Sequence, residues 1–133
     1  MARGDIPTAV KSGNQANKIL ARTPFEAIPM TIDFTSVSAD ADGYYKVAAG
    51  TPISPAGVPM EDPSETSEGV TTKMEGILLN DVYKDEPAGA ILKKAYIDCA
   101  MAKASSGCDY DATFVASAVA ICPMLVFENV VTA

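Results

Sequence analysis

The stretch that decides the fold is residues 76–99, GILLNDVYKDEPAGAILKKAYIDC. It begins with a continuous apolar run at 76–79, which is typical of a strand buried on both faces. Residues 84–89, KDEPAG, combine charged residues with Pro and Gly and therefore predict a turn. Beyond the turn, alternate residues of 90–99 are apolar except at Lys93, so a return strand is expected. Two strands of similar length around such a turn predict a β-hairpin.

Shorter strands are expected before this hairpin. Residues 28–37 alternate apolar and polar side chains, which places Met30, Ile32 and Phe34 on one face of a half-buried strand. Residues 40–43, DADG, predict a turn; they resemble the start of a calcium loop, but the later ligands of such a loop are missing.

Three further segments continue the pattern up to the hairpin. Residues 44–47 and 52–53 predict two short strands around a tight corner. Residues 54–73 contain several prolines together with Glu61, Asp62, Glu65 and Glu68. Because proline removes backbone donors and like charges repel, we expect an exposed acidic loop there.

The C-terminal part of the chain predicts one helix. Residues 100–110 are rich in Ala, Ser and Gly and are expected to form a loop. Asp111 can accept hydrogen bonds from the first free amides of a helix, and apolar residues at helical spacing follow it up to Pro123. Residues 124–127 predict a last short strand. The expected fold is therefore mostly β (α+β), with about six strands and one short C-terminal helix.

Composition excludes several classes of function. The chain has 133 residues and a formal net charge of −7, which disfavours nucleic acid as a partner. It contains no histidine, so the commonest general base and every Ser-His or Cys-His dyad are absent. The longest apolar stretch, residues 112–127, is broken by Pro123 and is shorter than the roughly 20 residues of a membrane span, so no membrane association is expected. Three cysteines without a CxxC pair predict reduced thiols, and no metal or cofactor is expected: Cys99, Cys108 and Cys122.

The charge is distributed unevenly along the chain. Residues 1–25 carry four basic and one acidic side chain, a net charge of +3, whereas residues 26–133 carry six basic and sixteen acidic side chains, a net charge of −10. Because residues 1–25 lack sustained periodicity, we interpret them as an extended arm on a β-rich domain of residues 26–133. The apolar side chains of the arm need a cover, from a partner, from their own domain or from a neighbouring subunit. The candidate contact residues are Ile6, Val10, Lys11, Lys18, Ile19, Leu20, Arg22 and Phe25.

Four short motifs, taken in order, resemble a known family. They are ADGYYKV at 41–47, AGTPI at 49–53, GILLNDV at 76–82 and AYID at 95–98. Over about residues 28–128 the chain is similar to the head decoration, or capsid cement, proteins of tailed bacteriophages, of the lambda-like type. The insert at 54–73 and the loop at 100–107 depart from the family pattern.

The resemblance implies a β-tulip, barrel-like domain with a structural role and no enzymatic activity. Proteins of this family form trimers on the outer surface of the expanded head, where they bridge subunits of the major capsid protein against the pressure of packaged DNA. The arm at 1–25 is then expected to add as a strand to an exposed edge of the shell. Its basic residues Lys11, Lys18 and Arg22 would speed the encounter. The expected location is the virion surface, after synthesis in the host cytoplasm.

Two alternatives remain open. The first is a head-surface binding module for a host surface or for glycans, whose contact surface would be the 54–73 loop with Tyr44, Tyr45 and Tyr110. The second is a small enzyme that uses Asp81 and Glu86 as paired carboxylates. Glycan binding that survives loss of the arm favours the first alternative. Activity that is lost when the two carboxylates are replaced favours the second.

Overall fold

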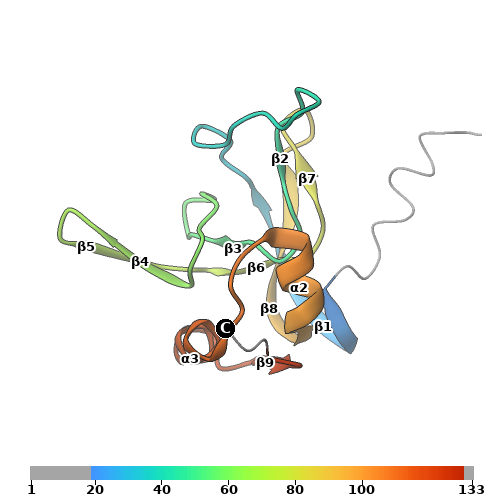
Figure 1. Ribbon diagram of the computed structural model, residues 1–133, viewed down its shortest axis with the longest axis vertical. Coiled ribbons are helices and arrows are strands. Elements are labelled where there is room, and N and C mark those ends of the chain that lie inside the picture. The colour runs from blue at the N-terminus through green and yellow to red at the C-terminus, as the bar shows by residue number, and fades with distance from the viewer. Residues whose placement is uncertain (1–18, 131–133) are drawn as a thin grey trace, which may run out of the picture.

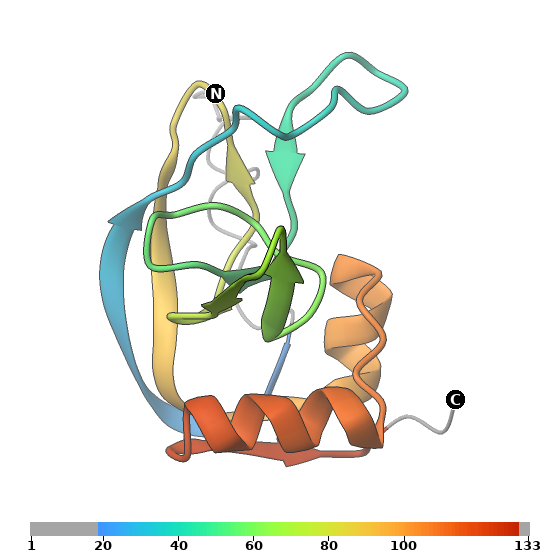
Figure 2. The ribbon, with the colours of Figure 1, turned by 90° about the vertical axis from the view of Figure 1, so that its left-hand side faces the viewer.

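The structure is a computed structural model that describes residues 19–130, and its main element is a five-stranded sheet (Figure 1). The strands are β1 (Leu20–Thr31), β3 (Pro52–Ile53), β6 (Gly76–Leu78), β8 (Ala88–Asp98) and β9 (Leu125–Glu128). Their order is β1-β8-β6-β3, with β9 paired in parallel to the end of β8 and all other neighbours antiparallel. The long strands β1 and β8 lie side by side along one wall of the molecule (Figure 2).

Two small ribbons and two helices accompany the sheet in the described part of the chain. They are the ribbon of β2 (Lys46–Val47) with β7 (Val82–Tyr83), the ribbon of β4 (Ser64–Ser67) with β5 (Val70–Lys73), α2 (Cys99–Ser106) and α3 (Ala112–Ile121). Figure 2 shows α3 lying along β9 at one end of the molecule, and Figure 1 shows β2 and β7 at the opposite end. The expected fold class, mostly β with a C-terminal helix, is confirmed. The described chain has two helices instead of one, and its sheets do not close into a barrel.

The antiparallel pairing predicted within 76–99 is confirmed for β6 and β8 and forms the centre of the core, but the two strands differ in length, and residues 82–83 form β7, which pairs with β2 instead. Ile77 lies opposite Leu92, and Leu78 lies opposite Ile91, and none of the four is exposed. Ile77 and Leu92 belong to a larger apolar cluster that includes the helices, whereas Leu78 and Ile91 belong to a second, smaller cluster. Both faces of β6 and β8 are therefore covered, as the continuous apolar run indicates.

The strand predicted at 28–37 is displaced toward the N-terminus. β1 ends at Thr31, but Ile32 and Phe34 remain buried in the smaller cluster and Met30 packs against it. The predicted shared face is therefore confirmed, although the ladder stops earlier. At its other end β1 begins at Leu20, so the domain boundary predicted at residue 25 is wrong for residues 19–25. Pairing with β8 supplies the hydrogen bonds that draw this segment into the sheet.

The loop predicted at 100–110 is wrong, because most of it is helix α2. Asp98 caps this helix by accepting a hydrogen bond from the amide of Met101, and Gly107 ends it in the left-handed conformation with φ of 80°. Between these two caps Cys99 and Ala102 are fully buried. Both capping residues can be identified in the sequence, but the alanine-rich segment between them lacks the amphipathic pattern that predicts a helix.

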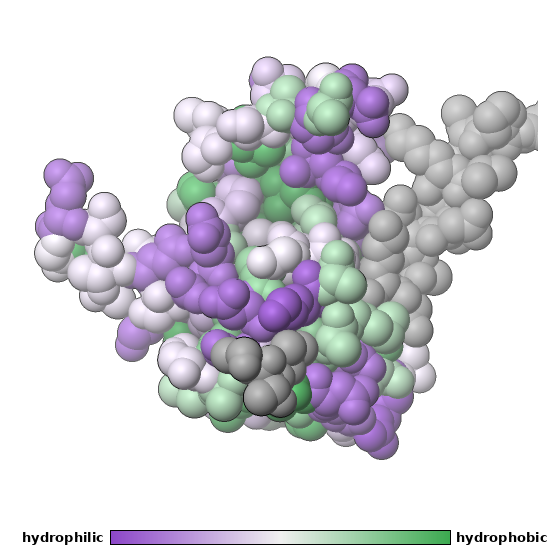
Figure 3. Space-filling model, viewed as in Figure 1, coloured by the Kyte–Doolittle hydropathy of each residue, from purple (hydrophilic) through white to green (hydrophobic). Residues whose placement is uncertain are grey.

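The loop predicted at 54–73 is only partly correct. Residues 64–73 form the ribbon of β4 and β5, joined at Glu68 and Gly69, which both have positive φ as a two-residue hairpin turn requires. The ribbon extends away from the body (Figure 1), and it is mainly hydrophilic (Figure 3). Its exposure and polarity agree with the prediction, whereas its regular pairing was not foreseen.

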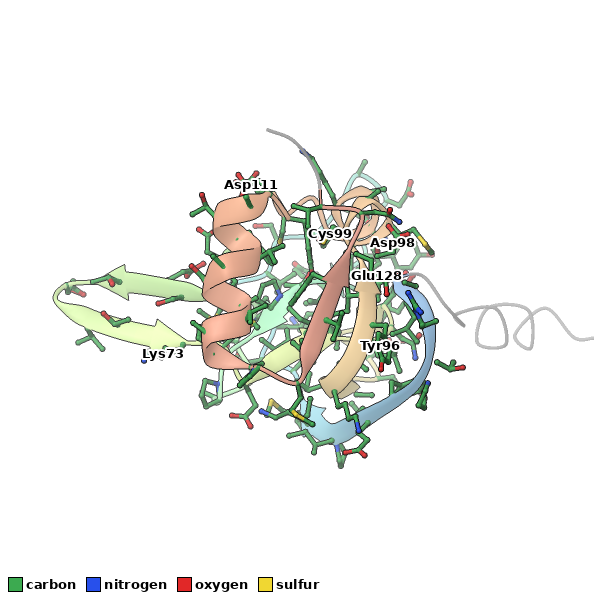
Figure 4. The ribbon with its side chains drawn as sticks, turned by 90° about the horizontal axis from the view of Figure 1, so that it is seen from below. Lys73, Tyr96, Asp98, Cys99, Asp111 and Glu128 are labelled. Carbon is green, nitrogen blue, oxygen red and sulfur yellow. The ribbon has the colours of Figure 1, made fainter. Side chains whose placement is uncertain are left out.

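The C-terminal predictions are confirmed. The carboxylate of Asp111 accepts a hydrogen bond of 2.9 Å from the amide of Phe114 at the start of α3, and the helix ends just before Pro123. Figure 4 shows Asp111 at the N-terminal end of α3 and places the helix beside β9. Within residues 19–130, no helix has the length and apolarity needed to cross a membrane.

Candidate functional site

The most exposed regular element of the described sheet is β1, at one end of the strand order. Eleven of its twelve residues are exposed or half-buried, and its only described partner is β8. Phe25 is 40% exposed and Ile28 is 37% exposed. Pro24 and Pro29 carry no backbone donor, which limits where another strand can pair with this edge. A long edge strand with apolar side chains is a template for strand addition by a partner.

Two of the predicted arm residues belong to the core instead. Ile19 is 0% exposed and Leu20 is 6% exposed, and both lie in the larger apolar cluster. The carbonyl of Ile19 also accepts a 2.8 Å hydrogen bond from the amide of Asp98. Burial in their own domain, which was one of the covers considered for the arm, removes these two residues from any partner surface. Their assignment as contacts is therefore wrong.

Arg22 is exposed but engaged within the domain. Its guanidinium lies 2.5 Å from the carboxylate of Glu128 and 5.4 Å from the ring centre of Tyr96. The hydrogen bond and the charge of Glu128 raise the pKa of Arg22 above its ordinary value. Figure 4 places Tyr96 and Glu128 on neighbouring strands, beside β1. Arg22 therefore links β1, β8 and β9, and its charge is already compensated.

Phe25 keeps the accessibility that the arm hypothesis needs. Ile28 lies beyond the arm predicted at 1–25 and was therefore not named as a contact, but the structure leaves it 37% exposed on the same strand. The exposed surface of β1, defined here by Phe25 and Ile28, is the candidate site. The remaining predicted contacts lie outside the described residues: Ile6, Val10, Lys11 and Lys18.

The carboxylates proposed for an enzyme have structural partners or lie at a turn. The carboxylate of Asp81 accepts a 2.9 Å hydrogen bond from the amide of Ala49, which fixes the corner before β3. Glu86 is exposed, and its amide closes a turn onto the carbonyl of Tyr83. Asp40 similarly accepts hydrogen bonds from the amides of Asp42 and Tyr44, so the DADG motif is a turn as predicted.

The thiols and the potential metal ligands of residues 19–130 are further groups that a reactive centre could use. All three cysteines are free and buried, and burial raises the pKa of each thiol, for Cys99 to about 11. A thiol with a raised pKa is a poor nucleophile near neutral pH. In the same residues, no cluster of three or more potential ligands is placed to hold a metal ion.

The tyrosines proposed for glycan contact are separated by the fold. Tyr110 is fully buried, so its assignment to a contact surface is wrong. Tyr44 is 63% exposed and Tyr45 is 38% exposed, and both lie at the end of the molecule formed by β2 and β7. The sequence could not distinguish these positions, because Tyr110 stands between Asp109 and Asp111 and so has the more polar neighbours, although it is the buried one.

Comparisons of the chain with models of protein families, with curated proteins and with solved structures find no match.

Proposed function

We propose that this chain is a structural decoration protein, which binds the outer surface of a phage head and bridges neighbouring subunits of the major capsid protein. The observation that carries the proposal is the exposed surface of β1, which continues directly from the basic N-terminal segment. The four motifs that resemble lambda-like decoration proteins support it. The proposed role is binding without catalysis.

The position of β1 suits a strand-addition mode of binding. Main-chain hydrogen bonds along a strand edge supply affinity, and side chains such as Phe25 and Ile28 supply specificity when they enter pockets of the partner. Burial of an exposed apolar side chain contributes about 1.5–3 kcal/mol when it is complete. Because both side chains are already partly covered, each would contribute less than this range.

The charge distribution suits an acidic partner surface. Residues 1–18 carry three basic and one acidic side chain, whereas residues 19–133 carry seven basic and sixteen acidic side chains. Because Arg22 is paired with Glu128, the proposal assigns the attraction to an acidic surface to the basic residues of 1–18. Basic residues at the edge of an interface accelerate encounter with an acidic surface. A trimer would present three such segments, and their linkage would raise the effective concentration of each.

The test is binding to expanded heads that were assembled without this protein. The informative variant lacks residues 2–18, because a deletion through residue 25 would also remove Ile19 and Leu20 from the core. We expect the full chain to co-sediment with expanded heads and to appear over the three-fold positions in a density map. The shortened chain should keep the circular dichroism spectrum of the full chain and lose head binding.

A second variant tests the exposed surface of β1 itself. Phe25→Ala should weaken head binding, whereas Val70→Ala, which removes an apolar side chain that is 65% exposed on the β4–β5 ribbon, should leave it unchanged. Absence of binding by the full chain would refute the decoration proposal. Saturation of heads by the shortened chain would refute the role of residues 1–18. Density for single copies away from the three-fold positions of the head would contradict the trimer.

A further inference from the structure

A pocket is lined by residues in and next to β2 and β7. These strands lie at the end of the molecule opposite α3 and β9 (Figure 1). The volume of the pocket is about 420 Å³, within the range of roughly 300–1,000 Å³ that small-molecule sites occupy. The residues that line it are Gly43, Tyr44, Tyr45, Tyr83, Lys84 and Asp85. They come from two segments about forty residues apart, so only the folded chain assembles them.

The walls of this pocket are fixed by backbone hydrogen bonds. Lys84 donates its amide to the carbonyl of Tyr45 over 3.1 Å, which continues the pairing of β2 with β7. The carboxylate of Asp40 holds the amide of Tyr44 at 3.0 Å, and Gly43 supplies the positive φ of 85° that the turn requires. A ligand would therefore meet a preorganised surface and would pay little entropy for ordering it.

The chemistry of the lining combines aromatic faces with charged hydrogen-bonding groups. Tyr44 and Tyr45 both expose a substantial part of their side chains, and the ammonium of Lys84 lies 4.6 Å from the ring centre of Tyr45. Lys84 offers donors and Asp85 offers acceptors at the same pocket. Aromatic bodies with a few convergent polar groups are the usual composition of a small-molecule site.

The charges around the pocket select among classes of ligand. An anion such as phosphate would meet Asp85, which lines the pocket, and carboxylates that are close to the lining in sequence, which are Asp40, Asp42 and Glu86. A cation would compete with Lys84, which already occupies one side of Tyr45. A wholly apolar ligand would remove water from Lys84 and Asp85 and would offer no hydrogen bonds in place of those that water makes.

We propose that this pocket binds a neutral carbohydrate, with the apolar face of the sugar ring against the exposed ring of Tyr44 and its hydroxyl groups bonded to Lys84 and Asp85. Such a ligand has one apolar face, which can pack on a tyrosine ring, and several hydroxyl groups, which can form hydrogen bonds with Lys84 and Asp85. The site is independent of the exposed surface of β1, and a chain bound to a head through β1 could present it outward. If the pocket bound no carbohydrate, the decoration proposal would still stand, because it rests on β1 and on residues 1–18.

The test is a titration of the isotope-labelled full chain, followed by amide chemical shifts. The probes are glucose, galactose, mannose and N-acetylglucosamine, and the comparison ligands are N-acetylneuraminic acid, inorganic phosphate and tetramethylammonium. We expect a neutral sugar to give saturable shifts at residues 43–45 and 83–85, with a dissociation constant on the order of 1 mM for a ligand of about a dozen non-hydrogen atoms. None of the charged comparison ligands should shift the same amides as strongly.

Substitutions at Tyr44 separate stacking from a nonspecific effect. Tyr44→Ala should weaken sugar binding at least about tenfold, whereas Tyr44→Phe, which keeps the ring, should change it by less than about twofold. Met124→Ala removes another exposed apolar side chain, 56% exposed near β9, and should have no effect. Three outcomes would overturn the proposal: no shifts with any neutral sugar, shifts centred elsewhere, or stronger binding of a charged probe at these residues.

Discussion

Replacement of Tyr110 by phenylalanine tests how the α2–α3 connection is held to the core. Tyr110 is fully buried, and its hydroxyl donates a hydrogen bond to the carbonyl of Gly50, at the corner before β3. Its ring centre lies 4.3 Å from that of Phe114 and 6.3 Å from that of Phe127. The substitution removes the hydroxyl and keeps the ring, so it isolates the polar contact from the packing.

The expected loss follows from the burial of the acceptor. A buried carbonyl left without its partner costs about 1–3 kcal/mol of folding free energy. With an unfolding entropy of about 2.1 cal/mol/K per residue near 60 °C, a chain of 133 residues loses about 3.5 °C of Tm for each kcal/mol. Tyr110→Phe should therefore lower Tm by about 4–11 °C.

Thermal and urea unfolding, followed by circular dichroism, measure this loss. Tyr44→Phe is the matched control, because the same hydroxyl is removed from a side chain that is 63% exposed, and its effect should stay within about 0.5 kcal/mol. The dependence of the free energy of unfolding on urea should keep its slope in both variants. If Tyr110→Phe and Tyr44→Phe had the same Tm as the parent, the hydrogen bond to Gly50 would contribute nothing and the reasoning would be refuted.

The pH dependence supplies a second readout for the same residue. Burial raises the pKa of Tyr110 well above its ordinary value, so the folded state holds this proton more tightly than the unfolded state does. This contribution is complete below the unfolded pKa, near pH 10, and is lost as the pH rises above it toward the folded pKa. The stability advantage of the parent over Tyr110→Phe should therefore shrink above about pH 10. A constant advantage up to pH 11 would contradict the raised pKa.

Three further predictions concern stability and thiol reactivity. Asp111→Ala should lower the free energy of unfolding by about 1 kcal/mol in urea titrations, because it removes the N-cap of α3, and an unchanged midpoint would contradict that role. Gly76→Ala should prevent folding or lower the free energy of unfolding by about 3 kcal/mol or more, because its Cβ would lie 2.4 Å from the carbonyl oxygen of Leu92 on β8. Calorimetry measures this loss, and an unchanged Tm would contradict the close approach of β6 and β8. At pH 8 a thiol-reactive disulfide reagent should modify none of the three buried cysteines in the folded chain and all three in urea, because burial raises the pKa of each; rapid modification of any thiol in the folded chain would contradict the structure.

The elements that the sequence predicted well are those with local signals. The hairpin at 76–99 combines an apolar run, a Pro-Gly turn and an alternating return strand within one stretch. Helix α3 combines a capping Asp111 with apolar residues at helical spacing and a terminating Pro123. In each case the pattern, the turn chemistry and the burial agree, so a short stretch of sequence was sufficient.

The predictions that failed depend on contacts between distant residues. Helix α2 is alanine-rich, and only its two caps marked it before its packing against the core was known. The start of β1 at Leu20 depends on pairing with the end of β8, more than seventy residues away. The local sequence carries no information on such pairing, because residues 20–25 taken alone are equally compatible with an unpaired extended segment and with a strand.

By itself, the sequence determined a mostly β domain with a buried central hairpin, a capped C-terminal helix, no histidine chemistry and a basic N-terminal segment. The tertiary structure decided which residues remain available to a partner. It buried Ile19, Leu20 and Tyr110, compensated Arg22 with Glu128, and left Phe25 and Ile28 at the surface. It also brought Tyr44 and Tyr45 together with Lys84 around one pocket. The physical reason is that exposure is a property of the packed chain, since each side chain is covered by residues that are remote in sequence.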